Sequence, residues 1–229
     1  MKKFTRILFF LICISPYSQA IAQQTVFNVP SADTAPKNKT FLQHESQFRA
    51  KDPEKYLNTT NYFARGITDN TEIDATLFNL GSPASKNVSL GLGFKNATKL
   101  ADNAFKPKFT FGSMIPFSLQ GNGAGNWTYA TLSAVAPISQ TRITGGASYG
   151  TKQIFGQETI CAIGAIEQQI NENFSLLTDW YSGNHSMGIL VFGFSHNLPQ
   201  DFSFYGGYQI PNSKRIGRNG FLIEIAKIF

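Results

Sequence analysis

His44 and Ser46 are the residues of this chain whose types and spacing suit nucleophilic catalysis. Side chains two positions apart on a β-strand point to the same face, so the imidazole and the hydroxyl could act as base and nucleophile. Such a pair also needs a third group that orients the histidine. The alternative is a His44 that lies at an interface with its hydrogen bonds satisfied. Neighbouring His185 and Ser186 would point to opposite faces of a strand, and His196 has no serine two residues later.

Other catalytic chemistry has little support in the sequence. No pair of His or Cys residues stands at the spacing of metal ligands, and no Gly-Lys-Thr phosphate loop occurs. Glycine-rich residues 121–125 are best explained as a loop, because no helix-forming sequence follows them. We therefore expect no metal, no cofactor and no catalytic residues.

Polar residues also recur at alternate positions inside otherwise apolar stretches. In the first such stretch four polar residues stand at odd-numbered positions, whereas Leu42 and Phe48 stand at even-numbered positions and so belong to the opposite face of a strand. Further on, Glu72 and Asp74 oppose Ile73 in the same way. The polar residues selected by this pattern, which carry charges of both signs, are Gln43, Glu45, Gln47, Arg49, Glu72, Asp74, Lys95 and Asp179.

The stretches that carry these residues have one repeated form from Thr40 onward. Each holds alternating side chains rich in Phe, Tyr, Ile, Leu, Thr and Gly, and each ends at Asn, Asp, Gly or Pro, which is typical of β-strands and turns. No window keeps a helical apolar period, so no helix is predicted. The predicted strands are 39–49, 58–67, 71–80, 87–96, 105–116, 126–136, 141–150, 157–170, 174–182, 186–196, 201–210 and 220–229.

The first residues have the pattern of a secretory signal peptide. Lys2, Lys3 and Arg6 precede a short apolar run, and small residues follow at cleavage spacing. We predict a signal peptide over residues 1–22, an extended or mobile leader over 23–39 and one domain over 40–229. Cleavage would lower the net charge from +6 to +3, which is too small a surplus for a nucleic-acid-binding protein. Cys161 would be the one remaining cysteine, so no intramolecular disulfide is expected.

Loop lengths distinguish a membrane barrel from a water-soluble sandwich, which has the same alternation of side chains. In an outer-membrane barrel the connections on one side are short turns, and those on the other side are longer loops. The predicted even-to-odd connections are short except 97–104, whereas the odd-to-even connections include 50–57, 81–86, 117–125 and 211–219. We therefore predict an all-β, antiparallel up-and-down transmembrane β-barrel of about twelve strands.

The last strand resembles the sorting signal of bacterial outer-membrane β-barrel proteins, in which an aromatic terminal residue follows apolar residues at alternate positions. The matching residues are Phe221, Ile223, Ile225 and Phe229. Lys227 departs from the pattern, since the third residue from the end is usually apolar or aromatic. The resemblance covers about residues 40–229. It implies the bacterial outer membrane as the location, with membrane lipid, lipopolysaccharide and the barrel-assembly machinery as partners.

A barrel of about twelve strands is intermediate between filled small barrels and wide porins, so a narrow pore is possible. We predict a narrow channel or transport-associated protein for small polar solutes, with the alternating polar residues in its lumen and no nucleic acid as partner. The first alternative is a plugged structural or recognition barrel, in which charges inside pair with one another and loops 50–57, 117–125 and 211–219 meet an external partner.

The second alternative is a lipid hydrolase. His44 and Ser46 have the spacing of a lipid-facing pair in an outer-membrane phospholipase, and lipid A deacylases have a similar geometry. In those enzymes the serine is followed by Asn, whereas Gln47 follows here, and His44 lies on the first strand instead of mid-barrel.

Residues 177–188 are the densest polar and aromatic cluster and leave two interpretations open. They could form a binding loop at the outer rim. We favour a hairpin in which Gly183 and Asn184 supply positive φ angles and Trp180 and Tyr181 lie at the membrane interface.

Overall fold

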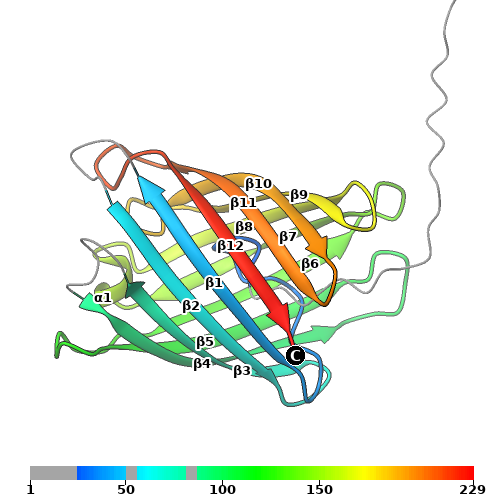
Figure 1. Ribbon diagram of the computed structural model, residues 1–229, viewed down its shortest axis with the longest axis horizontal. Helices are drawn as coiled ribbons and strands as arrows, with labels where there is room; N and C mark the ends of the chain where they lie inside the picture. The colour runs from blue at the N-terminus through cyan, green and yellow to red at the C-terminus, as the bar shows by residue number, and fades with distance from the viewer. Residues whose placement is uncertain (1–24, 50–55, 81–86) are drawn as a thin grey trace, which may run out of the picture.

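The computed structural model describes residues 25–49, 56–80 and 87–229, and twelve strands form a closed barrel in it (Figure 1). The predicted fold class is thereby confirmed, and each strand overlaps one of the predicted stretches. The strands are β1 (Thr40–Arg49), β2 (Tyr56–Gly66), β3 (Thr71–Leu80), β4 (Ser89–Lys99), β5 (Lys108–Ser118), β6 (Trp127–Val135), β7 (Thr141–Gly150), β8 (Ile160–Gln169), β9 (Phe174–Tyr181), β10 (Ile189–Leu198), β11 (Phe202–Pro211) and β12 (Gly220–Ile228).

Every strand pairs antiparallel with its neighbours in sequence, and the barrel closes where the first strand meets the last. Strands β1 and β12 run in register from Phe41 opposite Ile228 to Phe48 opposite Phe221. The backbone amide of Phe229 donates to the carbonyl of Thr40 at 2.8 Å, which extends this seam by one residue. Closure leaves no strand edge unpaired, as a sheet in a membrane requires.

The two ends of the barrel differ in the length of their connections. Short turns lie at the end of the barrel where Phe229 lies (Figure 1), and they are residues 67–70, 136–140, 170–173 and 199–201. The longer exception at this end, which the sequence predicted at 97–104, is 100–107. The opposite end carries the longer connections, including 119–126 and 212–219. This asymmetry is the one expected for an outer-membrane barrel.

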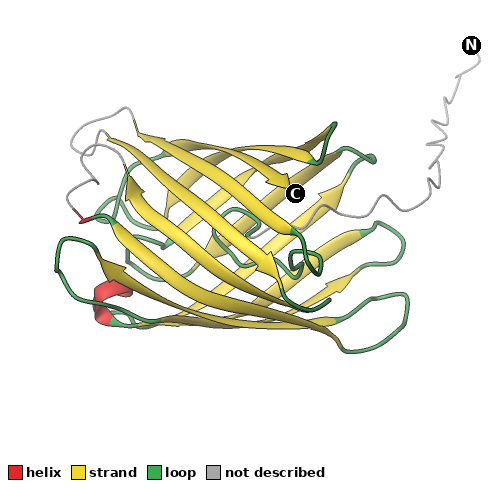
Figure 2. Cartoon of the chain, turned by 60° about the horizontal axis from the view of Figure 1, so that its bottom comes forward, coloured by secondary structure: helices red, strands yellow, loops and turns green. Residues whose placement is uncertain are grey.

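One short helix was not predicted. Helix α1 (Lys152–Phe155) lies in the connection between β7 and β8 at the long-loop end (Figure 2). Its four residues are too few to produce a periodic sequence signal. Phe155 is buried and stacks on His185, with ring centroids 4.5 Å apart, and burial lowers the pKa of His185. No helix among the described residues is long and apolar enough to cross a membrane.

The outer face of the barrel is apolar. Large aliphatic and aromatic side chains with the outward parity stay exposed on every side, for example Ile73 on β3, Leu132 on β6 and Phe192 on β10. Such a surface is unfavourable in water and favourable in a hydrocarbon layer. The C-terminal residues Phe221, Ile223, Ile225 and Phe229 belong to this exposed face, and their role in sorting stays a prediction.

Residues 25–35 lie inside the barrel, as the blue and green traces in Figures 1 and 2 show, whereas residues 36–39 are exposed at its short-turn end. Val26, Phe27 and Val29 are fully buried in the lumen, where they belong to one apolar cluster with Tyr181 and Leu222. The prediction of an extended or mobile leader was therefore wrong in one respect, because the segment is packed. The prediction relied on the prolines and polar residues of the segment, whereas its short apolar sequence is the part that barrel side chains cover.

The segment also approaches the barrel wall closely at Gly66. A Cβ atom on Gly66 would lie 2.2 Å from the carbonyl oxygen of Pro36, so a side chain there would collide with backbone. The amide of Asn38 donates to the carbonyl of Gly66 at 2.9 Å. The predicted signal peptide 1–22 and most of the predicted loop 50–57 lie outside the described residues.

Candidate functional site

The alternating polar residues chosen from the sequence point into the barrel. Seven of the eight are buried, and Gln47 is half-buried. They do not form a single cluster. Glu45 lies on β1 and Glu72, Asp74 and Lys95 lie on the adjoining strands β3 and β4, whereas Asp179 comes from β9.

Asp179 holds the N-terminal segment by its backbone. One carboxylate oxygen, Oδ2, accepts hydrogen bonds from the amides of Phe27, Asn28 and Val29 at 2.9, 2.5 and 2.7 Å. Successive amides that converge on one anion form a concave anion-binding arrangement of the backbone. Hydrogen bonds to a charged acceptor are stronger than neutral ones, so Asp179 is the principal polar anchor of residues 27–29.

A second anchor lies nearer the short-turn end. Asp33 of the segment pairs with Lys108 at 2.9 Å and with Arg142 at 2.6 Å. Arg142 also lies 3.6 Å from Glu167 on β8. Lys108 is the first residue of β5 and Arg142 is the second residue of β7. This ion-pair network therefore joins the segment to these two strands of the barrel wall.

Glu72 forms the third anchor. Its carboxylate accepts from the amide of Ala35 at 2.5 Å and pairs with Lys95 at 2.9 Å. Both charged side chains are almost completely buried, at 1% and 0% exposure. Two opposite charges in such a setting stabilise each other, because each offsets part of the hydration that the other has lost.

Two carboxyl groups face each other across the seam of β1 and β12. Glu45 and Glu224 are opposite in the strand register. Gln43 donates to Glu224 at 2.8 Å, and Gln47 donates to Glu45 at 2.7 Å. These amide donors are neutral, so each gives its carboxyl group a hydrogen bond without adding a positive charge.

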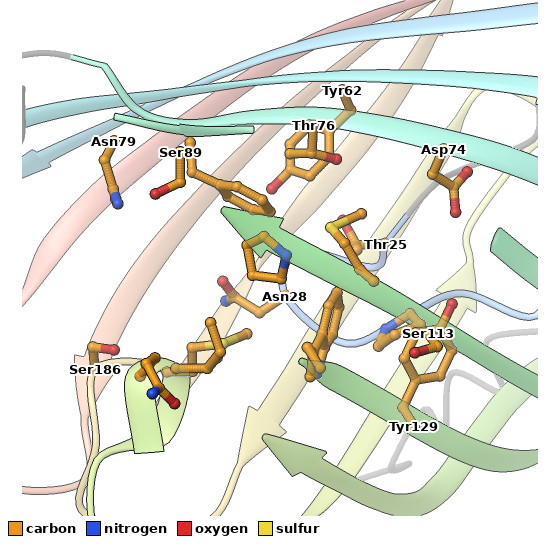
Figure 3. Close-up of a pocket in the computed structure, with 18 of the residues that line it drawn as sticks. Thr25, Asn28, Tyr62, Asp74, Thr76, Asn79, Ser89, Ser113, Tyr129 and Ser186 are labelled. Carbon is orange, nitrogen blue, oxygen red and sulfur yellow. The ribbon is translucent and has the colours of Figure 1, made fainter. Parts of the chain in front are cut away.

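A cavity of about 290 Å³ opens between the N-terminal segment and the wall formed by β2 to β6 (Figure 3). Thr25 and Asn28 of the segment lie on one side of it, and Asp74 and Thr76 of β3 lie on the other. Exposed Gln153 of α1 lies at the long-loop end of this cavity. The cavity is therefore a vestibule at the outer end of the lumen, with the segment as its floor.

The outer face of the barrel carries a separate polar cluster. His44 Nε2 lies 3.1 Å from Ser46 Oγ, and His44 Nδ1 lies 2.8 Å from Oδ1 of Asn61 on β2. All three side chains point away from the lumen, among exposed Leu42 and Ile225. The order hydroxyl, imidazole, amide is that of a nucleophile, a base and an orienting group.

Several of these residues were missed in the sequence. Asn61 is the third member of the outer cluster because it is opposite His44 in the register of β1 and β2, and that register is not evident from either strand alone. Glu224, Lys108 and Arg142 have the inward parity of their strands, which could have identified them. Asp33 could not have been found, because the packing of its segment was not foreseen.

The structure corrects two details of residues 177–188. Tyr181 is fully buried in the lumen and does not lie at the membrane interface, whereas Trp180 points outward and is 42% exposed. Gly183 has the expected positive φ of 95°, but Asn184 does not have one. The backbone amide of Asn184 donates to the carboxylate of Glu158 in the neighbouring loop at 2.8 Å. Among the residues that the structure describes, no group of His, Cys, Asp and Glu is suited to hold a metal ion.

Comparisons with known proteins identify the fold. No family model and no curated protein matches the chain. An outer membrane channel from Pseudomonas putida F1 superposes with a TM-score of 0.52 at 11% identity, over 88% of this chain and 100% of the channel. The KdgM porin in complex with disordered oligogalacturonate gives a TM-score of 0.54 at 8% identity, over 83% of this chain and 99% of the porin. The chain therefore has the fold of the bacterial outer-membrane β-barrels, and its apolar outer face is suited to that membrane.

Proposed function

We propose that the protein is a narrow channel or transport-associated barrel for small polar solutes, with a lumen that its own N-terminal segment restricts. The observation that carries the proposal is the polar vestibule of about 290 Å³ at the outer end of the lumen. A barrel of twelve strands encloses enough space for such a path. Proteins with this fold include a channel and a porin, as the comparisons report.

The N-terminal segment sets the state of this path. Asp179, Glu72 and Asp33 each anchor it in the lumen by hydrogen bonds or ion pairs. A continuous route for solute requires residues 25–35 to shift, since their apolar side chains fill the lumen below the vestibule. The path is therefore gated and not a permanently open pore.

Single-channel recording in a planar bilayer tests the proposal. The mature chain should give brief or small openings, and a variant that lacks residues 25–35 should give larger and more persistent ones. Heat-modifiable gel mobility confirms in both cases that the barrel is folded. Silence from both folded proteins would contradict a channel and favour the plugged recognition barrel.

A second candidate function, a lipid hydrolase, is favoured by the His44–Ser46–Asn61 cluster. In this reaction Ser46 Oγ would attack an ester carbonyl carbon while His44 Nε2 takes its proton. The proton would pass to the departing alcohol, and water would then hydrolyse the acyl-serine. Asn61 would hold the imidazole in orientation through Nδ1, at the observed 2.8 Å.

The cluster also has a purely structural explanation. Three polar side chains that face hydrocarbon must find partners among themselves, because lipid offers none. Ser46→Ala separates the two explanations. A hydrolase loses release of fatty acid from phospholipid vesicles by at least about 10³-fold, whereas a structural cluster produces no release in either protein.

Ser113→Ala is the matched control. Ser113 shares the outward face of β5 with exposed Phe111 and Ile115, and its hydroxyl contacts that of Thr128 at 2.9 Å without a histidine nearby. Loss of the Ser113 hydroxyl should leave the release of fatty acid unchanged. Equal loss in both variants would attribute the effect to barrel stability and remove the support for catalysis.

A further inference from the structure

The vestibule has a lining that selects by chemistry as well as by size. Among the described residues that line it, Asp74 alone carries a formal charge, and no lysine or arginine takes part. The other polar members are neutral hydroxyls and amides, which serve as both donors and acceptors. They are Thr25, Asn28, Thr76, Asn79, Asn87, Ser89, Gln153 and Ser186.

Aromatic side chains supply the apolar part of the wall. Trp127 and Tyr129 have ring centroids 5.2 Å apart, and both line the cavity together with Tyr62. The indole N–H of Trp127 already donates to Ser148 at 2.7 Å. Its hydrogen-bonding requirement is therefore met within the wall, and what the ring offers to a ligand is apolar contact.

A glycine makes room for this wall. A Cβ atom on Gly112 would lie 2.3 Å from the hydroxyl oxygen of Tyr129, so the ring can take its position only because residue 112 has no side chain. The cavity of about 290 Å³ is at the small end of ligand pockets, which begin near about 300 Å³. It is suited to a single ring and not to a long chain.

From this lining we infer that the vestibule binds an uncharged, hydroxylated ring of monosaccharide size, with one apolar face against Trp127 and Tyr129. This inference deepens the proposed function by naming the class of solute, and it rests on that function for its physiological meaning. An anionic sugar should bind poorly, because its carboxylate would lie near the carboxylate of Asp74, and none of the described lining residues is a lysine or an arginine.

Fluorescence of Trp127 gives a direct test in the refolded barrel. The chain has two tryptophans, and Trp180 is exposed on the outer face, so a Trp180→Phe background leaves Trp127 as the reporter. Methyl glucoside should produce a saturable change in its emission. Glucuronate at the same ionic strength should bind at least about tenfold more weakly, a difference of about 1.4 kcal/mol.

Two variants localise the binding. Asp74→Asn should reduce the discrimination between the neutral and the anionic sugar, because it removes the repelling charge. Thr76→Phe should abolish the signal, because it fills the cavity, and gel mobility checks that the barrel remains folded. No saturable signal with methyl glucoside in the folded parent barrel, or tighter binding of glucuronate, would overturn the inference.

Failure of the inference is distinguishable from failure of the channel proposal. Saturable binding without conductance would support the binding site and contradict the channel. Conductance without binding would support the channel and contradict the site.

Discussion

At the scale of single residues, the lumen depends on charges that compensate one another. Glu72→Ala should destabilise the barrel by roughly 3–5 kcal/mol, because Lys95 would lose its carboxylate at 2.9 Å in a position without exposure to solvent. The amide of Ala35 would lose its acceptor as well. Urea titration followed by heat-modifiable mobility measures the change in the free energy of unfolding.

The double variant Glu72→Leu with Lys95→Met is the control for this prediction. It removes both charges and restores apolar volume, so it should be closer in stability to the parent than the single variant. A double variant no more stable than Glu72→Ala would show that the hydrogen bond to Ala35, which both variants lack, dominates at this position, and not charge compensation.

At the scale of elements, the N-terminal segment is the part whose position depends on a few anchors. Asp179→Ala removes the acceptor of three backbone amides, at Phe27, Asn28 and Val29. Hydrogen bonds to charged groups contribute about 1.5–3 kcal/mol each, so the segment should open at least about tenfold more often. Hydrogen exchange at these three amides measures the opening.

Asp179→Asn is the matched comparison, since it keeps an oxygen acceptor and the size of the side chain. Its exchange rates should lie between those of the parent and of Asp179→Ala. Exchange that stays as slow in Asp179→Ala as in the parent would mean that apolar packing of Val26 and Phe27 holds the segment without the carboxylate.

The strands were predictable because each one has its own local signal. Alternation in β1 identified both the inward Glu45 and the outward Leu42, and turn residues marked most strand ends to within a few positions. The N-terminal segment lacks such a signal, because its structure comes from contacts with β3, β5, β7 and β9. Asn61 was missed for the same reason, since its role depends on the register between two strands.

At the scale of the whole molecule, the balance of charge in the lumen predicts which ions pass. Glu72 pairs with Lys95, and Asp33 pairs with Lys108 and Arg142. Glu45 and Glu224, in contrast, face each other and are hydrogen-bonded to neutral amides, so the two carboxyl groups share one negative charge on the β1–β12 side of the lumen. A confined negative surface concentrates cations and repels anions.

The channel should therefore prefer K⁺ over Cl⁻ by about tenfold, a preference of the size that charged clefts produce. Reversal potentials in a KCl gradient measure this ratio for the mature chain, which keeps Asp33 beside Lys108 and Arg142. Glu45→Gln with Glu224→Gln should bring the ratio towards one, because both carboxylates are lost while amide contacts remain possible. Glu172→Gln, in an exposed turn outside the lumen, should leave it unchanged. Equal ratios in all three proteins would assign the selectivity to charges at the barrel mouths and not to the carboxyl pair across the seam.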